Sequence, residues 1–136
     1  MQVLIDTNII LDVLLNREPF VQNAVKILKI PESKVYKFVS ASAITDIYYI
    51  AYQQIRNKAK VKDLIKTALN IIHVANVSED NILHALDSDW ADFEDSVQNA
   101  VAESLEVDGI ITRNKSDYKK SNLKVFSPEE FLNEII

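Results

Sequence analysis

Five short runs of β-branched and aromatic residues alternate along this chain with longer segments in which apolar residues recur at helical spacing. This alternation is typical of an α/β fold. Strands that are separated by helices cannot pair as hairpins, so we expect a mostly parallel sheet with helices on both faces. The predicted strands lie at residues 3–5, 36–39, within 71–77, at 109–112 and at 124–126.

The segments between the predicted strands carry ordinary helix signals. Serines at residues 40, 78 and 127 stand where N-caps are expected, and Pro128 with two acidic residues announces the last helix. No repeat, low-complexity stretch or linker interrupts the 136 residues, so we predict one domain over 1–136. The predicted helices cover 9–15, the segment after Pro19, 43–57, 62–71, 78–86, 92–107 and the segment after Ser127.

Composition excludes several classes of protein. With 48% hydrophobic and 26% charged residues, and no apolar run of the roughly 18–20 residues that cross a bilayer, we expect neither disorder nor a membrane span. The start of the chain lacks the pattern of a signal peptide, which favours a cytoplasmic protein. The absence of cysteine excludes disulfides and thiolate chemistry, and the single glycine, Gly109, excludes Gly-rich phosphate loops.

The net charge of −5 hides a strong segregation of charge. Residues 79–108 include ten acidic side chains and no Lys or Arg, whereas basic side chains concentrate in 56–66 and 113–120. These basic runs are either solvated helix faces or contacts for a polyanion, and the sequence leaves both interpretations open.

Four acidic residues stand at or near predicted strand ends. Asp6 follows the first strand, Asp117 follows the fourth, Asp46 lies in a strongly apolar helix, and Asp95 lies in the first turn of another. Three of them have an ordinary alternative role, because Asp6 and Asp95 suit helix N-termini and Asp46 could face solvent. Asp12, about a turn and a half beyond Asp6, is expected to face outward and is left out of this set.

Ligands bind beyond the carboxyl ends of the strands in parallel sheets, so we expect the four acids to meet there. Gathered carboxylates repel one another unless a cation lies among them or some are protonated. Magnesium and manganese prefer carboxylate oxygen and water, and this chain offers few nitrogen or sulfur ligands. The sequence therefore predicts a divalent-ion site.

The segments around these acids are VLIDTNIILD (3–12), SAITDIYY (42–49), DFEDSVQ (92–98) and IITRNKSDY (110–118), followed by FSPEEFL (126–132). In this order and spacing they resemble the PIN-domain ribonucleases, a family that includes the VapC-type toxins of bacterial and archaeal toxin–antitoxin pairs. The resemblance covers nearly the whole chain. It implies a three-layer α/β/α domain with about five short strands, and metal-dependent endonuclease activity on RNA.

Carried over residue by residue, the resemblance implies a catalytic pocket of Asp6, Asp46, Asp95 and Asp117. It implies that Asp6, Asp95 and Asp117 hold Mg²⁺ or Mn²⁺. The family commonly has Glu where this chain has Asp46, which is one methylene shorter, so we expect Asp46 to reach the ion through water. The residues expected to support the pocket or position the substrate are Thr7, Asn8, Thr112 and Asn114.

The same resemblance implies RNA as substrate, a homodimer, and an antitoxin partner that inserts an Arg or Lys into the acidic groove. Phosphate contacts supply most sequence-independent affinity for nucleic acid, so basic side chains are expected to hold RNA beside the pocket. The predicted RNA contacts are Arg56, Lys58, Lys60, Lys62, Arg113 and Lys115.

Two other functions remain open. The chain could be a catalytically silent PIN-like module that binds RNA or protein, which the shorter Asp46 favours. It could also be a phosphohydrolase of another α/β family in which Asp6 is a covalent nucleophile. Asn8 argues against the second, because many such enzymes have a carboxylate at that position.

Overall fold

The sheet is parallel throughout, as the sequence predicts. The computed structural model describes residues 1–135 and places five strands in one sheet with the order β3-β2-β1-β4-β5. The strands are β1 (Gln2–Ile5), β2 (Tyr36–Ser40), β3 (His73–Ala75), β4 (Gly109–Ile111) and β5 (Lys124–Phe126). Each predicted strand is confirmed, with bounds that differ by at most one residue where bounds were given.

The helices begin where the sequence offers caps. Ser40, Ser78 and Ser127 each accept a hydrogen bond from a backbone N–H in the first turn of the following helix. The prediction was wrong for the helix expected at 62–71, which begins at Lys58 because the Asn57 side chain caps it. The bounds are α1 (Thr7–Leu14), α2 (Val21–Leu28), α3 (Ala41–Ile55), α4 (Lys58–Ala68), α5 (Glu79–Asp87), α6 (Phe93–Leu105), the 3₁₀ helix η1 (Lys115–Tyr118) and α7 (Pro128–Glu134).

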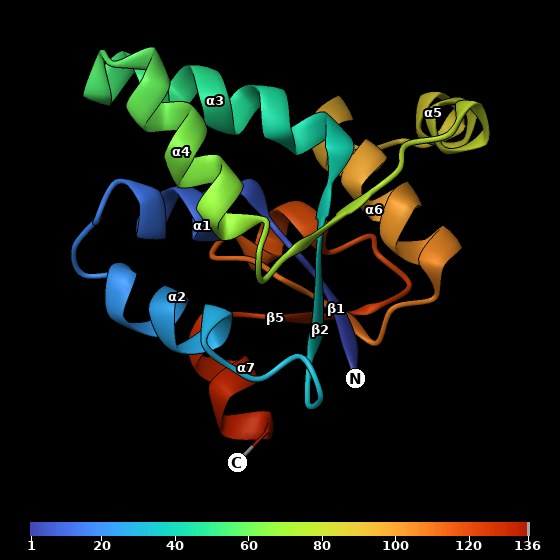
Figure 1. Cartoon of the computed structure of the whole chain (residues 1–136). Helices are drawn as coiled ribbons and strands as arrows, with labels where there is room; N and C mark the ends of the chain where they lie inside the picture. Colours follow the sequence, from blue (N-terminus) through green and yellow to red (C-terminus); the bar gives the residue numbers. More distant parts are fainter. Residues whose placement is uncertain (136) are drawn as a thin grey trace.

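The helices cover both faces of the sheet (Figure 1). Alternate residues of β1 enter different cores: Val3 and Ile5 pack with α1, α2, α3 and α7, whereas Leu4 packs with α6. This arrangement confirms the predicted three-layer α/β/α architecture. Within the described residues, no helix is both long enough and apolar enough to cross a bilayer.

Gly109 allows β4 and β5 to lie close together. A Cβ atom added there would lie 2.6 Å from Phe126 Cε2 and 3.0 Å from the Lys124 carbonyl oxygen. We therefore expect Gly109→Ala to lower the free energy of unfolding by about 1–3 kcal/mol through overpacking, measured by urea denaturation. Adding Phe126→Leu should recover part of this loss because it removes the ring. If the Gly109→Ala variant were as stable as wild type, the prediction would be contradicted.

Candidate active site

The strand order reverses between β1 and β4. The chain runs outward from β1 to β2 and β3 and then crosses back to β4 and β5. Asp6 follows β1, and its backbone N–H donates to the Ile111 carbonyl oxygen at 3.0 Å, so the strand ends that carry Asp6 and Thr112 adjoin. Such a switch point forms a crevice in which α/β proteins bind ligands.

The four acids predicted from sequence line one cavity of about 360 Å³ at this crevice. Asp6 comes from the end of β1, Asp46 from α3, Asp95 from α6 and Asp117 from η1. Four segments that are distant in sequence thus bring their carboxylates to one hollow. The other residues lining it are Thr7, Asn8, Ile50, Asp92, Glu94, Gln98 and Asn114.

Asp6 is buried and held from several sides. Its Oδ2 accepts a hydrogen bond from the Thr112 hydroxyl at 2.7 Å. Its Oδ1 accepts from the Thr7 backbone N–H at 2.8 Å and from Gln98 Nε2 at 3.3 Å. Burial raises the pKa of the Asp6 carboxyl, and these hydrogen bonds oppose the rise. The side chain is fixed in position while its negative charge remains unfavourable.

Asp95 shows the strongest effect of the gathered carboxylates. Its pKa is raised to about 7 by burial and, next, by the charges of Asp92, Asp6 and Asp117. Tyr118 contacts it, with the hydroxyl 3.4 Å from Asp95 Oδ1, and burial together with the adjacent carboxylates raises the tyrosine pKa. The Tyr118 hydroxyl therefore stays protonated and donates to the carboxylate.

The side chains fit a hard divalent ion. The polar side chains that line the cavity are carboxylates, carboxamides and one hydroxyl, and their oxygen atoms suit Mg²⁺ or Mn²⁺ as ligands. In the part of the chain that the structure describes, Thr7 Oγ1 and Gln98 Oε1 are buried without a hydrogen-bond partner, so both oxygen atoms are available to an ion or its water. Among residues 1–135, however, no three acidic, His or Cys side chains already converge as a ligand group. The carboxylates would therefore move toward an ion as it bound, because a cation offsets their mutual repulsion.

The four residues that were expected to support the pocket or position the substrate divide into two groups. Thr7, Asn8 and Asn114 line the cavity, whereas Thr112 is fully buried and acts on Asp6 through its hydroxyl.

Two further residues that contact the acids, Gln98 and Tyr118, were not predicted as site residues. Gln98 lies three residues beyond Asp95 on α6, so the helical spacing places both on one face and could have indicated that Gln98 lies at the site. No local signal marks the Tyr118 hydroxyl. Asp92 caps α6, as expected for its position, and also lines the cavity.

One prediction about a charged side chain was wrong. Asp12 does not face outward: it is fully buried and pairs with Arg113, whose Nε lies 2.7 Å from Asp12 Oδ2. This buried carboxylate holds the Arg113 guanidinium in place, and the predicted contact of Arg113 with RNA phosphate stays a prediction. The other predicted RNA contacts, Arg56, Lys58, Lys60, Lys62 and Lys115, are exposed, and Lys115 pairs with Glu130 at 2.9 Å.

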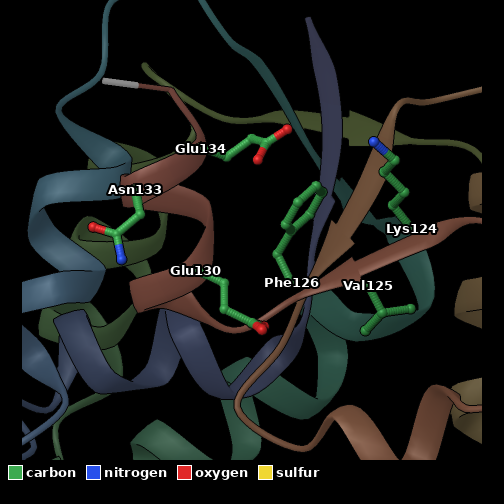
Figure 2. A pocket seen from close by; sticks show the side chains of 6 residues that line it. All are labelled: Lys124, Val125, Phe126, Glu130, Asn133 and Glu134. Atoms are coloured by element: carbon green, nitrogen blue, oxygen red, sulfur yellow. The ribbon is translucent and has the colours of Figure 1, made fainter.

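A second hollow lies away from these acids. Figure 2 shows the side chains of Lys124 and Phe126 on β5 and of Glu130 and Glu134 on α7. They line a hollow of about 520 Å³. It shares no lining residue with the acidic cavity, and the Lys115 ammonium already engages Glu130. The hollow between β5 and α7 therefore adds no side chain to the acidic cavity.

Comparison with known proteins gives one consistent family. A family model described as PIN domain matches residues 2–116. No curated protein sequence matches the chain.

Similar solved structures include VapBC2 from Rickettsia felis bound to a DNA fragment from its promoter, at a TM-score of 0.73 and 13% identity over 93% of this chain and 98% of that one. A toxin–antitoxin complex from Klebsiella pneumoniae has a TM-score of 0.69 and 21% identity over 93% and 97% of the two chains. The sarcin-ricin loop cleaving toxin VapC20 from Mycobacterium tuberculosis has a TM-score of 0.64 and 14% identity over 79% and 86%. At these identities the likeness establishes the fold.

Proposed function

The chain belongs to the PIN-domain family, and from this premise we propose that it is a metal-dependent endoribonuclease that acts as the toxin of a toxin–antitoxin pair. One observation carries the proposal: four segments bring carboxylates to a single cavity, where burial and the neighbouring charges of Asp92, Asp6 and Asp117 raise the pKa of Asp95 to about 7. This clustering costs stability, which is expected where a cation and its substrate bind.

Asp6, Asp95 and Asp117 would hold Mg²⁺ or Mn²⁺, with Asp46 contributing through water. A bound ion supplies a water of lowered pKa and offsets negative charge on the scissile phosphate. Thr112, Thr7 and Gln98 hold the Asp6 carboxylate in place. The protonated Tyr118 hydroxyl steadies Asp95 without adding negative charge.

The basic side chains of α4 would bind the RNA backbone. Arg56 lies just before this helix, which carries Lys58, Lys60 and Lys62, all exposed. Cations on one element provide sequence-independent contacts to phosphates and offset the repulsion between RNA and the acidic cavity. Lys115, which is next to Asn114 in the segment after β4, would also contact RNA phosphates.

An antitoxin partner is supported by the solved structures with this fold, among them a toxin–antitoxin complex. An Arg or Lys from such a partner would suit the cavity by charge, since it could lie among the carboxylates in place of the ion. We also propose that the protein acts as a homodimer in the cytoplasm.

The proposed activity is tested by incubating the purified chain with a panel of structured and single-stranded RNAs, in Mg²⁺, in Mn²⁺ and in EDTA. We expect discrete cleavage products with either ion and none with EDTA. RNA binding without ion-dependent cleavage would instead favour the catalytically silent module. A phosphoaspartate trapped at Asp6 would favour the covalent hydrolase, a hypothesis that the family assignment does not support.

A further inference from the structure

Asp12 and Arg113 form an ion pair outside the acidic cavity. Asp12 lies on α1 with its side chain buried, and Arg113 is the second residue after β4. Arg113 Nε donates to Asp12 Oδ2 at 2.7 Å and Nη2 donates to Oδ1 at 3.2 Å. The guanidinium carbon lies 3.8 Å from the centre of the Phe20 ring. A two-pronged ion pair under an aromatic ring fixes the guanidinium firmly.

The pair joins the two segments that supply opposite parts of the cavity. Asp6 caps α1, the helix that carries Asp12. Directly after Arg113 come Asn114 and then Asp117, both of which line the cavity. The side chain of Asp117 is largely exposed, so little packing fixes it, and its place depends on how the segment 112–118 is anchored.

Beside the packing of the Tyr118 ring against Trp90, three side chains of that segment are tied to other elements by hydrogen bonds that are at least partly buried. Thr112 donates to Asp6, and Tyr118 donates to Asp95. Both acceptors are carboxylates that would hold the ion, so ion binding would alter these two anchors. Arg113 bonds to Asp12, which does not line the cavity. Of these three anchors, only the last is independent of the ion.

We propose that Asp12 and Arg113 are positioning residues that set the separation between Asp6 and Asp117 and thereby the affinity for the divalent ion. The inference rests on the proposed function. Residues that orient metal ligands without touching the metal typically change affinity by about 10–100-fold when they are replaced. A purely structural ion pair would change stability and leave ion affinity alone.

The test compares Asp12→Asn and Arg113→Lys with wild type. We expect Asp12→Asn to weaken Mn²⁺ binding about 10–100-fold, with faster amide hydrogen exchange at residues 114–117 and a smaller loss of cleavage at saturating Mn²⁺. Arg113→Lys keeps the charge but not the two-pronged contact, so its effect should be intermediate. Circular dichroism and the free energy of unfolding show whether each variant is folded under these conditions.

Two matched control variants distinguish the positioning of the segment 112–118 from the simple neutralisation of the buried Asp12 charge. Arg17→Gln removes the other cation near Asp12 without touching the segment 112–118, since Arg17 Nη1 lies 3.7 Å from Asp12 Oδ1. Glu130→Gln releases Lys115 from α7, and glutamine preserves the capping box with Ser127. Both variants should bind Mn²⁺ as wild type does.

If wild type binds Mn²⁺ and Asp12→Asn binds it equally well, or if Arg17→Gln weakens it as much, the positioning role is wrong. If wild type binds no Mn²⁺, the proposed function itself is wrong.

Discussion

Replacing Asp6 by Asn should abolish RNA cleavage while the fold is retained or becomes more stable. Asp6 is the most rigidly held of the four acids, with both carboxylate oxygens hydrogen-bonded. Loss of its charge removes an ion ligand and should lower the cleavage rate by about 10²–10³-fold or more. Asparagine fits the same space and relieves the desolvation that raises the pKa of Asp6, so we expect the free energy of unfolding to stay equal or rise by about 1 kcal/mol.

The measurement pairs single-turnover cleavage rates with urea denaturation for the same preparations. Asp63→Asn is the matched control, because Asp63 is an exposed acid on α4 away from the cavity. That variant should cleave RNA at the wild-type rate. An Asp6→Asn protein that cleaves RNA as wild type does, or that loses activity only by unfolding, would refute the role given to Asp6.

In the absence of divalent ions, stability should fall as pH rises from about 4 to about 7. The pKa of Asp95 is raised to about 7 from the ordinary 3.8, so the folded protein keeps a proton that the unfolded chain has already released in this range. Below about pH 4, Asp95 is protonated in both states and its full contribution to stability is present. Above about pH 7 that contribution has been lost. Because Asp95 is partly exposed and its charge is screened, we expect a decrease of about 1–3 kcal/mol.

Mg²⁺ should offset this decrease, since an ion binds the deprotonated carboxylates and its affinity rises over the same pH range. Urea denaturation at several pH values, with Mg²⁺ and with EDTA, measures both effects. Asp95→Asn should remove most of the pH dependence, whereas Asp63→Asn should keep it. An ion-free protein that gains stability between about pH 5 and pH 7 would contradict the account of Asp95.

The architecture and the four acids were predictable because their signals are local. Apolar runs mark the strands; Asp6 follows β1 directly, and Asp117 lies six residues after the end of β4. A parallel sheet brings its strand ends to one edge, so residues far apart in sequence were expected to meet. The helix at Lys58 was predicted four residues late, although Asn57 offered a cap that signalled the earlier start.

The contacts between side chains from distant segments were not predictable in this way. Asp12 precedes Arg113 by 101 residues, and nothing near either one predicts their pairing. On periodicity alone Asp12 was expected to face solvent, and Arg113 was grouped with the basic RNA contacts. The tertiary structure reverses the assignment of Asp12 and gives Arg113 a buried partner, because a buried carboxylate needs a cation and the segment after β4 supplies one.

The most direct test of the central claim measures ion binding and RNA cleavage in the same samples. Free Mn²⁺ is followed by its electron paramagnetic resonance signal while labelled RNA is cleaved, for wild type, Asp6→Asn and Asp95→Asn. The account predicts that cleavage by wild type rises with Mn²⁺ occupancy and that both variants lose occupancy and cleavage together. Cleavage that persists in EDTA, or Mn²⁺ occupancy that is unchanged in both variants, would contradict it.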